Sequence, residues 1–352
     1  MHDVNEISWA RSQRVARRRA AAVLPRCRRA MALALLAWSA ATGALAADRF
    51  PSKPVTMIAA FPPGGPADVL ARAMQPTMSR LLGQPFIIEN LPGAGGALAV
   101  QRMLSLPADG HTLIMGSPNE AILAPLSNAS AKYKAEDMAL IAPVSTHPLV
   151  VMTRPDLPYT SLEQLIAASA KPGSEGLSFG SPGYGTMYHI VSEYLAQASG
   201  AKLLHVPYRG ATPMLTDLAG RQIDLTILPN LGASIQMIDA QKIKAIGVMD
   251  TQRLRTLPGV PAVTEGSLPH KADYVYSVWL AVMAKAGIPP DRLQVLLDAS
   301  HQAIQSPEMV KALALSGAEP MKPQSLAASA AFYRSETEKF ARMARSIKLS
   351  PQ

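Results

Sequence analysis

Residues 55–72 read VTMIAAFPPGGPADVLAR, and this stretch decides the class of fold. Its first part, 55–60, is an apolar run of the length of a buried strand. A loop rich in proline and glycine follows, and residues 67–82 then have apolar side chains at helical spacing. A strand, a glycine-rich loop and a helix in this order are the unit of a sheet whose faces are covered by helices.

The same alternation continues along the chain. Apolar runs bounded by glycine and proline predict further strands at 86–89, 112–116, 149–153, 177–180, 202–206, 224–228 and 244–248. Helical spacing predicts helices at 96–104, 161–170, 186–199, 213–218 and 235–240, and a helical chain after Pro290. We therefore expect an α/β fold with mostly parallel sheets.

Two extended segments, 143–153 and 274–282, are long enough to run from one half of the molecule into another. They predict two α/β lobes around a central cleft, the first formed by 48–146 with 274–352 and the second by 147–273. In open α/β sheets, ligands bind at the carboxyl ends of the strands. The glycine and proline loops at those ends are therefore the candidate ligand sites.

The charge of the chain is concentrated at its start. The net charge of the 352 residues is +9, and residues 1–47 contain eight arginines, no lysine and two acidic residues. An apolar run at 30–38 and the sequence ALAA at 44–47 complete the pattern of a cleaved secretory signal peptide. The remaining 26 basic and 23 acidic residues carry only +3, which gives no indication of a nucleic-acid-binding surface.

Cysteine and histidine usage narrows the chemistry. Cys27, the one cysteine, lies in the predicted leader, so the mature chain has no disulfide, thiol nucleophile or cysteine metal ligand. An exported protein without disulfides is consistent with the bacterial periplasm as its location. The histidines are scattered along the sequence and form no metal-binding motif. We therefore expect neither a metal nor a cofactor.

The first candidate site is the loop 61–68. Gly64 and Gly65 allow the backbone to approach a ligand closely, and free amides at the start of the following helix attract anions. The alternative is an ordinary turn in which Asp68 stabilises the first helical turn and pairs with Arg72.

The second candidate is the loop 178–189, which also joins a strand to a helix. Ser181 and Thr186 supply hydroxyls, and Gly183 and Gly185 leave their amides accessible, so the loop is a plausible carboxylate cradle. His189 follows in the first helical turn, and it could either contact the ligand or have a structural role.

A hydrolase is the alternative function. Residues 176–180 read GLSFG, a literal match to the nucleophile motif G-x-S-x-G. In hydrolases the serine lies on the turn between strand and helix, whereas Ser178 lies inside a predicted strand. No spacing among the later histidines and aspartates selects a catalytic triad.

A signal peptide and seven motifs, in this order, carry a resemblance to a known family. After the signal peptide come FPPGGPADVLAR (61–72), LGQP (82–85), ENLPGAGG (89–96), PADGHTL (107–113), GSPGYGT (180–186) with His189, HVPYRG (205–210) and LPGVPAVTE (257–265). This series resembles the Bug receptors, the substrate-binding proteins of tripartite tricarboxylate transporters, over essentially all of 48–352.

The resemblance implies a periplasmic binding protein of the type II-like fold that captures a small carboxylate between its lobes. It implies a monomer without catalytic activity that delivers the ligand to a membrane permease or a periplasmic sensor domain. The implied ligand-binding residues are Phe61, Pro62, Gly64, Gly65, Asp68, Ser117, Asn119, Ser181, Gly183, Gly185, Thr186, His189, Tyr208 and Asn230.

Overall fold

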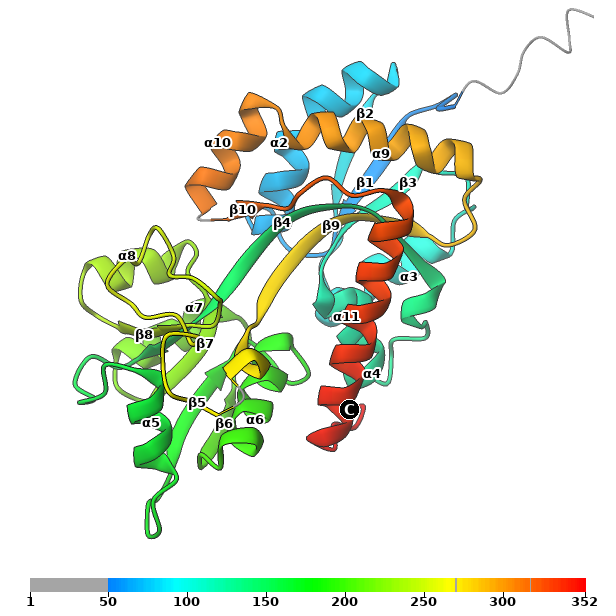
Figure 1. Cartoon of the computed structure of the whole chain (residues 1–352). Helices are drawn as coiled ribbons and strands as arrows, with labels where there is room; N and C mark the ends of the chain where they lie inside the picture. Colours follow the sequence, from blue (N-terminus) through cyan, green and yellow to red (C-terminus); the bar gives the residue numbers. More distant parts are fainter. Residues whose placement is uncertain (1–49, 270, 317) are drawn as a thin grey trace, which may run out of the picture. The chain divides into compact units, whose positions relative to one another are not determined.

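The computed structural model describes residues 50–269, 271–316 and 318–352 (Figure 1). The predicted signal peptide lies outside these residues. Lys53–Gln352 form one compact unit, which contains all the elements below. Among the helices of the described residues, none has both the length and the apolar character that a membrane span requires.

The first strand group consists of three parallel strands in the order β2, β1, β3. These are β2 (Phe86–Asn90), β1 (Val55–Ala59) and β3 (Thr112–Gly116), joined by α2 (Pro66–Leu82) and α3 (Ala97–Leu104). Gly83 ends α2 in the left-handed conformation at φ 65°, where glycine avoids the strain of a side chain. The predicted strands and helices are confirmed here to within two residues.

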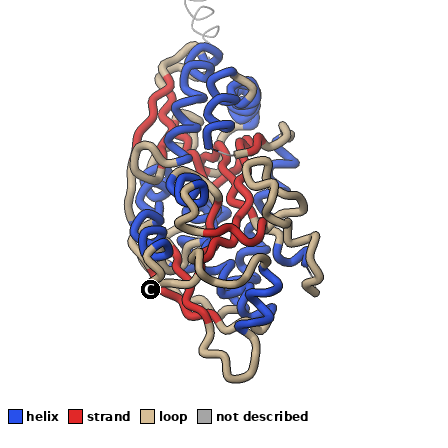
Figure 2. The backbone as a smooth tube through the Cα atoms, turned by 90° about the vertical axis from the view of Figure 1, so that its left-hand side faces the viewer, coloured by secondary structure: helices blue, strands red, loops and turns tan. Residues whose placement is uncertain are grey.

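The second strand group is built in the same way, with the parallel order β7, β5, β6. It contains β5 (Leu177–Ser181), β6 (Leu203–Pro207), β7 (Leu225–Pro229) and β8 (Lys244–Val248), with the helices α5 (Leu162–Ser169), α6 (Met187–Ser199), α7 (Ala211–Ala219) and α8 (Ala233–Asp239). Helices lie on both sides of the strands (Figure 2).

Two long strands join the groups. β4 (Met138–Thr153) and β9 (Ser277–Lys285) run antiparallel side by side (Figure 1), and β4 continues from Leu149 into pairing with β7 and β8. β4 begins at Met138, five residues before the predicted segment 143–153. Shifts in pairing at Leu140/Ala142 and Pro143/Ser145 accommodate Pro143 in its interior.

β9 also differs from its prediction, since the strand begins at Ser277 instead of residue 274. Residues Lys271–Tyr274 form a short 3-10 turn, and the strand extends to Lys285. The apolar pattern could not distinguish these cases, because Tyr274 is buried in the turn just as Trp279 is buried in the strand.

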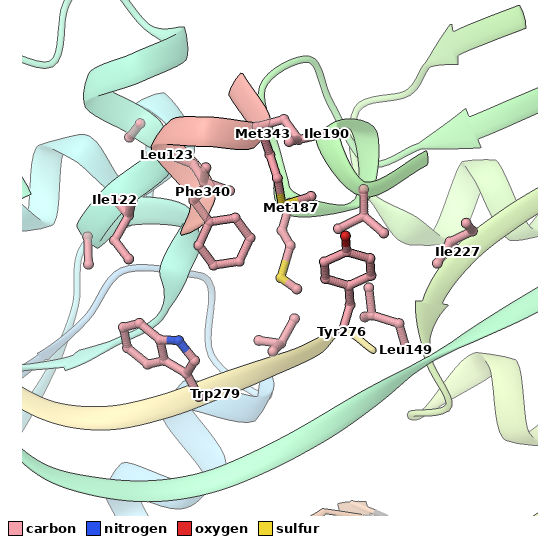
Figure 3. Close-up of a cluster of buried hydrophobic side chains, with 14 of the residues drawn as sticks. Ile122, Leu123, Leu149, Met187, Ile190, Ile227, Tyr276, Trp279, Phe340 and Met343 are labelled. Atoms are coloured by element: carbon pink, nitrogen blue, oxygen red, sulfur yellow. The ribbon is translucent and has the colours of Figure 1, made fainter. Parts of the chain in front are cut away.

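The C-terminal part packs across the joining strands. It comprises α9 (Pro290–Ile304), α10 (Pro307–Ser316), the short strand β10 (Glu319–Pro320), which pairs with β4, and α11 (Leu326–Ser346). Figure 3 shows Trp279 of β9, Phe340 of α11 and Met187 of α6 gathered in one apolar cluster. One continuous core therefore links the two strand groups through α11.

Candidate ligand-binding site

A cavity of about 470 Å³, the main pocket, lies at the carboxyl ends of strands from both groups. Phe61 follows β1, Ser117 follows β3, Pro182 follows β5, and Pro229 ends β7. The expectation that the loops at strand ends surround the candidate site agrees with this placement. Its volume falls within the range of roughly 300–1,000 Å³ typical of small-molecule sites.

Four of the proposed ligand residues line the main pocket: Phe61, Ser117, Asn119 and Thr186. Gly185 lies beside it, in a smaller cavity of about 280 Å³ whose lining shares Asn119 and Thr186. The other proposed residues, which line neither cavity, are Pro62, Gly64, Gly65, Asp68, Ser181, Gly183, His189, Tyr208 and Asn230.

Asp68 holds the first loop from behind. Its Oδ2 accepts the N–H of Gly64 at 2.9 Å, and its Oδ1 accepts Nε of Arg72 and Nδ2 of Asn90, each at 2.9 Å. Burial raises its pKa, but the hydrogen bonds from Arg72, Gly64 and Asn90 outweigh this effect, and the pKa lies below its ordinary value. The side chain is 3% exposed, so its contacts match the alternative of a turn-stabilising residue.

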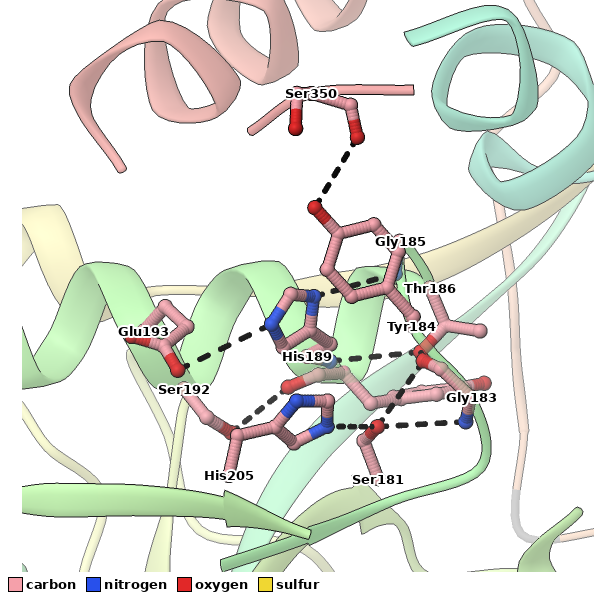
Figure 4. Close-up of polar contacts among 11 residues, drawn as sticks. Ser181, Gly183, Tyr184, Gly185, Thr186, His189, Ser192, Glu193, His205 and Ser350 are labelled. Carbon is pink, nitrogen blue, oxygen red and sulfur yellow. Dashed lines mark hydrogen bonds and ion pairs between the residues drawn. The ribbon is translucent and has the colours of Figure 1, made fainter. Parts of the chain in front are cut away.

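Ser181 and Gly183 shape the second loop from inside (Figure 4). The buried Ser181 hydroxyl lies 3.0 Å from the Gly183 carbonyl oxygen and 2.7 Å from Nε2 of His205. Thr186 donates its hydroxyl to the same carbonyl at 2.7 Å. These contacts close the turn that carries Thr186 to the pocket wall.

His189 lies beneath this turn. Its Nδ1 accepts the N–H of Gly185 at 3.2 Å, and its ring stacks on His205 with centroids 4.0 Å apart (Figure 4). Burial lowers the pKa of both histidines to about 4, with the charge of His205 adding to the effect on His189. Both rings are therefore neutral at physiological pH and buttress the loop.

The histidines are less scattered in space than in sequence. One ligand atom from each of His189, Glu193 and His205 lies within 4.8 Å of the others. Residues 189 and 193 are one turn apart on α6, and β6 supplies the third. The rings of His189 and His205 are stacked, with their planes 25° apart. His189 and His205 also each use a nitrogen in a hydrogen bond within the loop. We therefore assign the cluster to supporting the loop.

Tyr208 and Asn230 lie one layer behind the lining. The Tyr208 hydroxyl donates to Oδ2 of Asp217 at 2.8 Å. Asn230 is 5% exposed, and its Oδ1 accepts the hydroxyl of Ser234 at 3.3 Å. Ser234 is the residue of this pair that lines the main pocket.

Ser178 lies within β5 and not on the strand-to-helix turn. Both its amide and its hydroxyl donate to Oδ2 of Asp224, at 2.7 and 2.8 Å. It pairs with Leu204 of β6 in the sheet. The serine hydrolase alternative is not supported by this position.

Sequence reasoning missed the apolar part of the lining. Besides His147, Tyr188 and the loop residues around the strand ends, the main pocket is lined by Leu215, Leu228, Leu231, Val278 and Leu280. The alternation of Val278 and Leu280 along one face of β9 was the signal available in the sequence.

A buried carboxylate lies directly behind Ser117. Glu120 is 1% exposed, and its two carboxylate oxygens accept the Ser117 amide at 2.5 Å and the Ser117 hydroxyl at 2.6 Å. Burial raises its pKa to about 7, although the hydrogen bonds from Ser117 oppose the shift. The native state therefore holds a proton on Glu120 in a pH range where the unfolded chain has lost it.

Glu120→Gln is expected to remove the dependence of folding stability on pH that the proton on Glu120 causes. The stability that the protonated carboxyl contributes is fully present below pH 4.5 and is lost as the pH rises through 7. Glutamine cannot ionise, so the variant should gain about 3 kcal/mol relative to the parent chain between pH 4.5 and 8. Urea unfolding across this range measures the difference. The exposed Glu338→Gln is the control, and a parallel pH profile for Glu120→Gln and the parent chain would contradict the assignment.

Two helices begin at the main pocket without a side-chain cap. α2 follows Gly65 and α7 follows Gly210, and at neither position does a side chain accept an amide of the first turn. By contrast, the hydroxyl of Thr186 caps α6 and that of Ser161 caps α5. Pro66 and Ala67 of α2 and Gly210 and Ala211 around the start of α7 line the pocket. Uncapped helix N-termini attract anions through free amides and the helix dipole.

Comparisons with known proteins identify the family. A family model described as "Tripartite tricarboxylate transporter family receptor" matches residues 70–349. Protein BugT of Bordetella pertussis is 34% identical over 280 residues, which cover 79% of this chain and 84% of BugT.

Solved structures agree with this match. The periplasmic binding protein BugD has a TM-score of 0.70 and 25% identity, over 86% of this chain and 100% of the BugD chain. Rpa4515 of R. palustris, solved with adipate, has a TM-score of 0.73 and 28% identity, over 86% of this chain and 100% of its own. The predicted α/β fold of a periplasmic binding protein is thereby confirmed, as is the resemblance to the Bug receptors. The chain belongs to the receptor family of tripartite tricarboxylate transporters.

Proposed function

We propose that this chain is a solute receptor that binds a small carboxylate in the main pocket. The observation that carries the proposal is the pair of uncapped helix N-termini, α2 from the first strand group and α7 from the second, at one pocket. Together they provide amides and positive dipole ends for one anion without a charged side chain. The adipate in the related Rpa4515 supports this class of ligand.

Binding is coupled to closure of two lobes, which we place at 48–146 with 274–352 and at 147–273. Asn119 of the first lobe accepts the N–H of Met187 of the second through its Oδ1 at 3.0 Å. The Tyr184 hydroxyl of the second lobe donates to the carbonyl of Ser350 of the first at 3.1 Å. Backbone hydrogen bonds of Gln352 with Ser127 and Ala129 hold this end of the chain within the first lobe. A ligand that contacts both lobes favours the closed state by its differential affinity for that state.

The proposed site residues fall into two roles. Phe61, Ser117, Asn119 and Thr186 contact the ligand from the lining, together with the amides that begin α2 and α7. The loop residues behind the lining hold these groups in place.

The chain reaches the periplasm through the predicted signal peptide, which is removed after Ala46 or Ala47. There it acts as a monomer that catalyses no reaction and binds no nucleic acid. Its partners are the membrane permease of a tripartite transporter or a periplasmic sensor domain. The description of the family as receptors of tripartite tricarboxylate transporters supports the former partner.

Ala211→Asp tests the role of α7. An acidic residue at the first helical position favours the helix, so folding should be unaffected. Its charge should lower the affinity for a carboxylate at least tenfold, as measured by isothermal titration calorimetry, because it lies at the proposed anion site. Ala328→Asp places the same charge in the first turn of α11 and should leave affinity unchanged. Equal affinities for both variants would contradict the proposed site.

A further inference from the structure

Much of the main pocket is aliphatic. Leu215 of α7, Leu228 of β7, Leu231, and Val278 and Leu280 of β9 all line it. All but Leu231, which is half-buried, belong to the buried core of the protein. Such a surface stabilises the apolar part of a ligand in proportion to the area that it removes from water.

The described lining contains no lysine, arginine, aspartate or glutamate. Its ionisable side chains are His147 and Tyr188. Burial lowers the pKa of His147 to about 4. Burial and the charge of Glu120 raise the pKa of Tyr188 to about 12, although a hydrogen bond with Asn119 opposes the shift. Both groups are neutral at physiological pH, so helix dipoles are the pocket's main source of positive potential.

Three of the four hydroxyls of the lining already donate within the protein, the fourth being that of Tyr188. Ser117 donates to Oε2 of Glu120 at 2.6 Å, Thr186 to the carbonyl of Gly183 at 2.7 Å, and Ser234 to the carbonyl of Leu231 at 2.9 Å. A second carboxylate would therefore be buried with few donors available to it. Burying an ionised group without such partners is strongly unfavourable.

Two carboxylates lie behind the lining. Glu120 lies behind Ser117, and Asp68 lies in the first turn of α2 next to Ala67. The carboxylate of Asp68 is paired with Arg72 at 2.9 Å. Among the described residues, the carboxylate of Glu120 has no such cation, and it is hydrogen-bonded by Ser117. Because the pKa of Glu120 is about 7, its carboxylate is partly ionised at neutral pH and then opposes additional negative charge on a ligand, whereas an uncharged body meets no such opposition.

We propose that the main pocket selects monocarboxylates with an aliphatic or aromatic body and discriminates against a second carboxylate. This inference rests on the proposed function and specifies its ligand class. The carboxylate lies at the starts of α2 and α7, and the uncharged body lies against the aliphatic residues. The pocket thus differs in selectivity from the adipate-bound relative, whose ligand is a dicarboxylate.

Matched acids test this selectivity on the parent chain. Isothermal titration calorimetry at pH 7.5 compares hexanoate with adipate, and 3-phenylpropanoate with 3-(4-carboxyphenyl)propanoate. We expect the monocarboxylate of each pair to bind at least tenfold more tightly. Equal or tighter binding of the dicarboxylates would overturn the inference while leaving the receptor function intact. If no monocarboxylate, dicarboxylate or tricarboxylate binds, the proposed function itself fails.

Leu231→Arg provides a second test. Leu231 is half-buried in the loop after β7, where a long side chain can be accommodated. The added guanidinium should reverse the preference toward the dicarboxylate of each pair by about tenfold, because it supplies the missing cation. Leu204→Arg, on the edge strand at a position 70% exposed, should not change the preference. A stably folded Leu231→Arg variant that keeps the parent preference would overturn the inference.

Discussion

Gly185→Val is expected to lower the affinity for a carboxylate at least 100-fold, or by about 2.7 kcal/mol. A Cβ at this position would lie 2.1 Å from Cβ and 2.2 Å from Oγ of Ser127. Ser127 ends α4 (Ala124–Ser127), which follows β3, whereas Gly185 precedes α6. The side chain would therefore force apart the two loops that meet beside the main pocket. Calorimetric titration with the tightest-binding acid measures the loss.

Gly200→Val is the matched control for backbone strain. Both glycines have φ +73°, a conformation that disfavours a β-branched residue, but a Cβ at Gly200 meets no atom within 4 Å. Gly200→Val should lose stability and keep its affinity. Ser127→Gly in the Gly185→Ala background should restore part of the affinity, since it removes both clashing atoms. Equal affinities for the Gly185 and Gly200 valine variants would contradict the close approach.

Trp279→Ala is expected to lower the free energy of unfolding by about 3–5 kcal/mol, the range typical of large aromatic truncations. Trp279 is 2% exposed and packs edge-on against Phe332 and Tyr333 of α11, with ring centroids 5.8 and 6.2 Å away. Its Nε1 donates to Oε2 of Glu336 at 3.1 Å. The truncation removes the packing between β9 and α11 and leaves Glu336 without this donor.

Urea unfolding of three variants separates these contributions. Trp279→Phe should cost less than Trp279→Ala, because it keeps most of the packing and removes the indole N–H. Leu204→Ala, at an exposed position, should change stability by less than about 0.5 kcal/mol. A Trp279→Ala variant as stable as Leu204→Ala would show that this cluster does not hold α11 to the joining strands.

The strands and helices were largely predictable because their signals are local. Apolar runs punctuated by glycine and proline located β1 to β3 and β5 to β8 to within two residues. β4 and β9 were the exceptions, and β4 was difficult to predict because Pro143 and Pro148 lie inside it and proline normally interrupts a strand. Pairing shifts against β9 absorb Pro143, and such shifts depend on a partner more than 100 residues away.

The loops of the candidate site were predictable, but the residues that face the pocket were not. Asp68 is hydrogen-bonded to Asn90, and Ser181 to His205. These contacts determine the roles of Asp68 and Ser181, and they arise only when the chain is folded. These polar residues therefore lie behind the lining, while Leu228 and Leu280, which read as ordinary core residues, form part of it. The clustering of His189 with His205 was hidden for the same reason.

The most direct test is calorimetric titration of the parent chain with a series of mono-, di- and tricarboxylates. We expect saturable binding of a carboxylate at one site per chain, without turnover. Ala211→Asp should weaken this binding at least tenfold, and Ala328→Asp should leave it unchanged. Absence of binding to every acid in the series, or ester hydrolysis that Ser178→Ala abolishes, would contradict the receptor function.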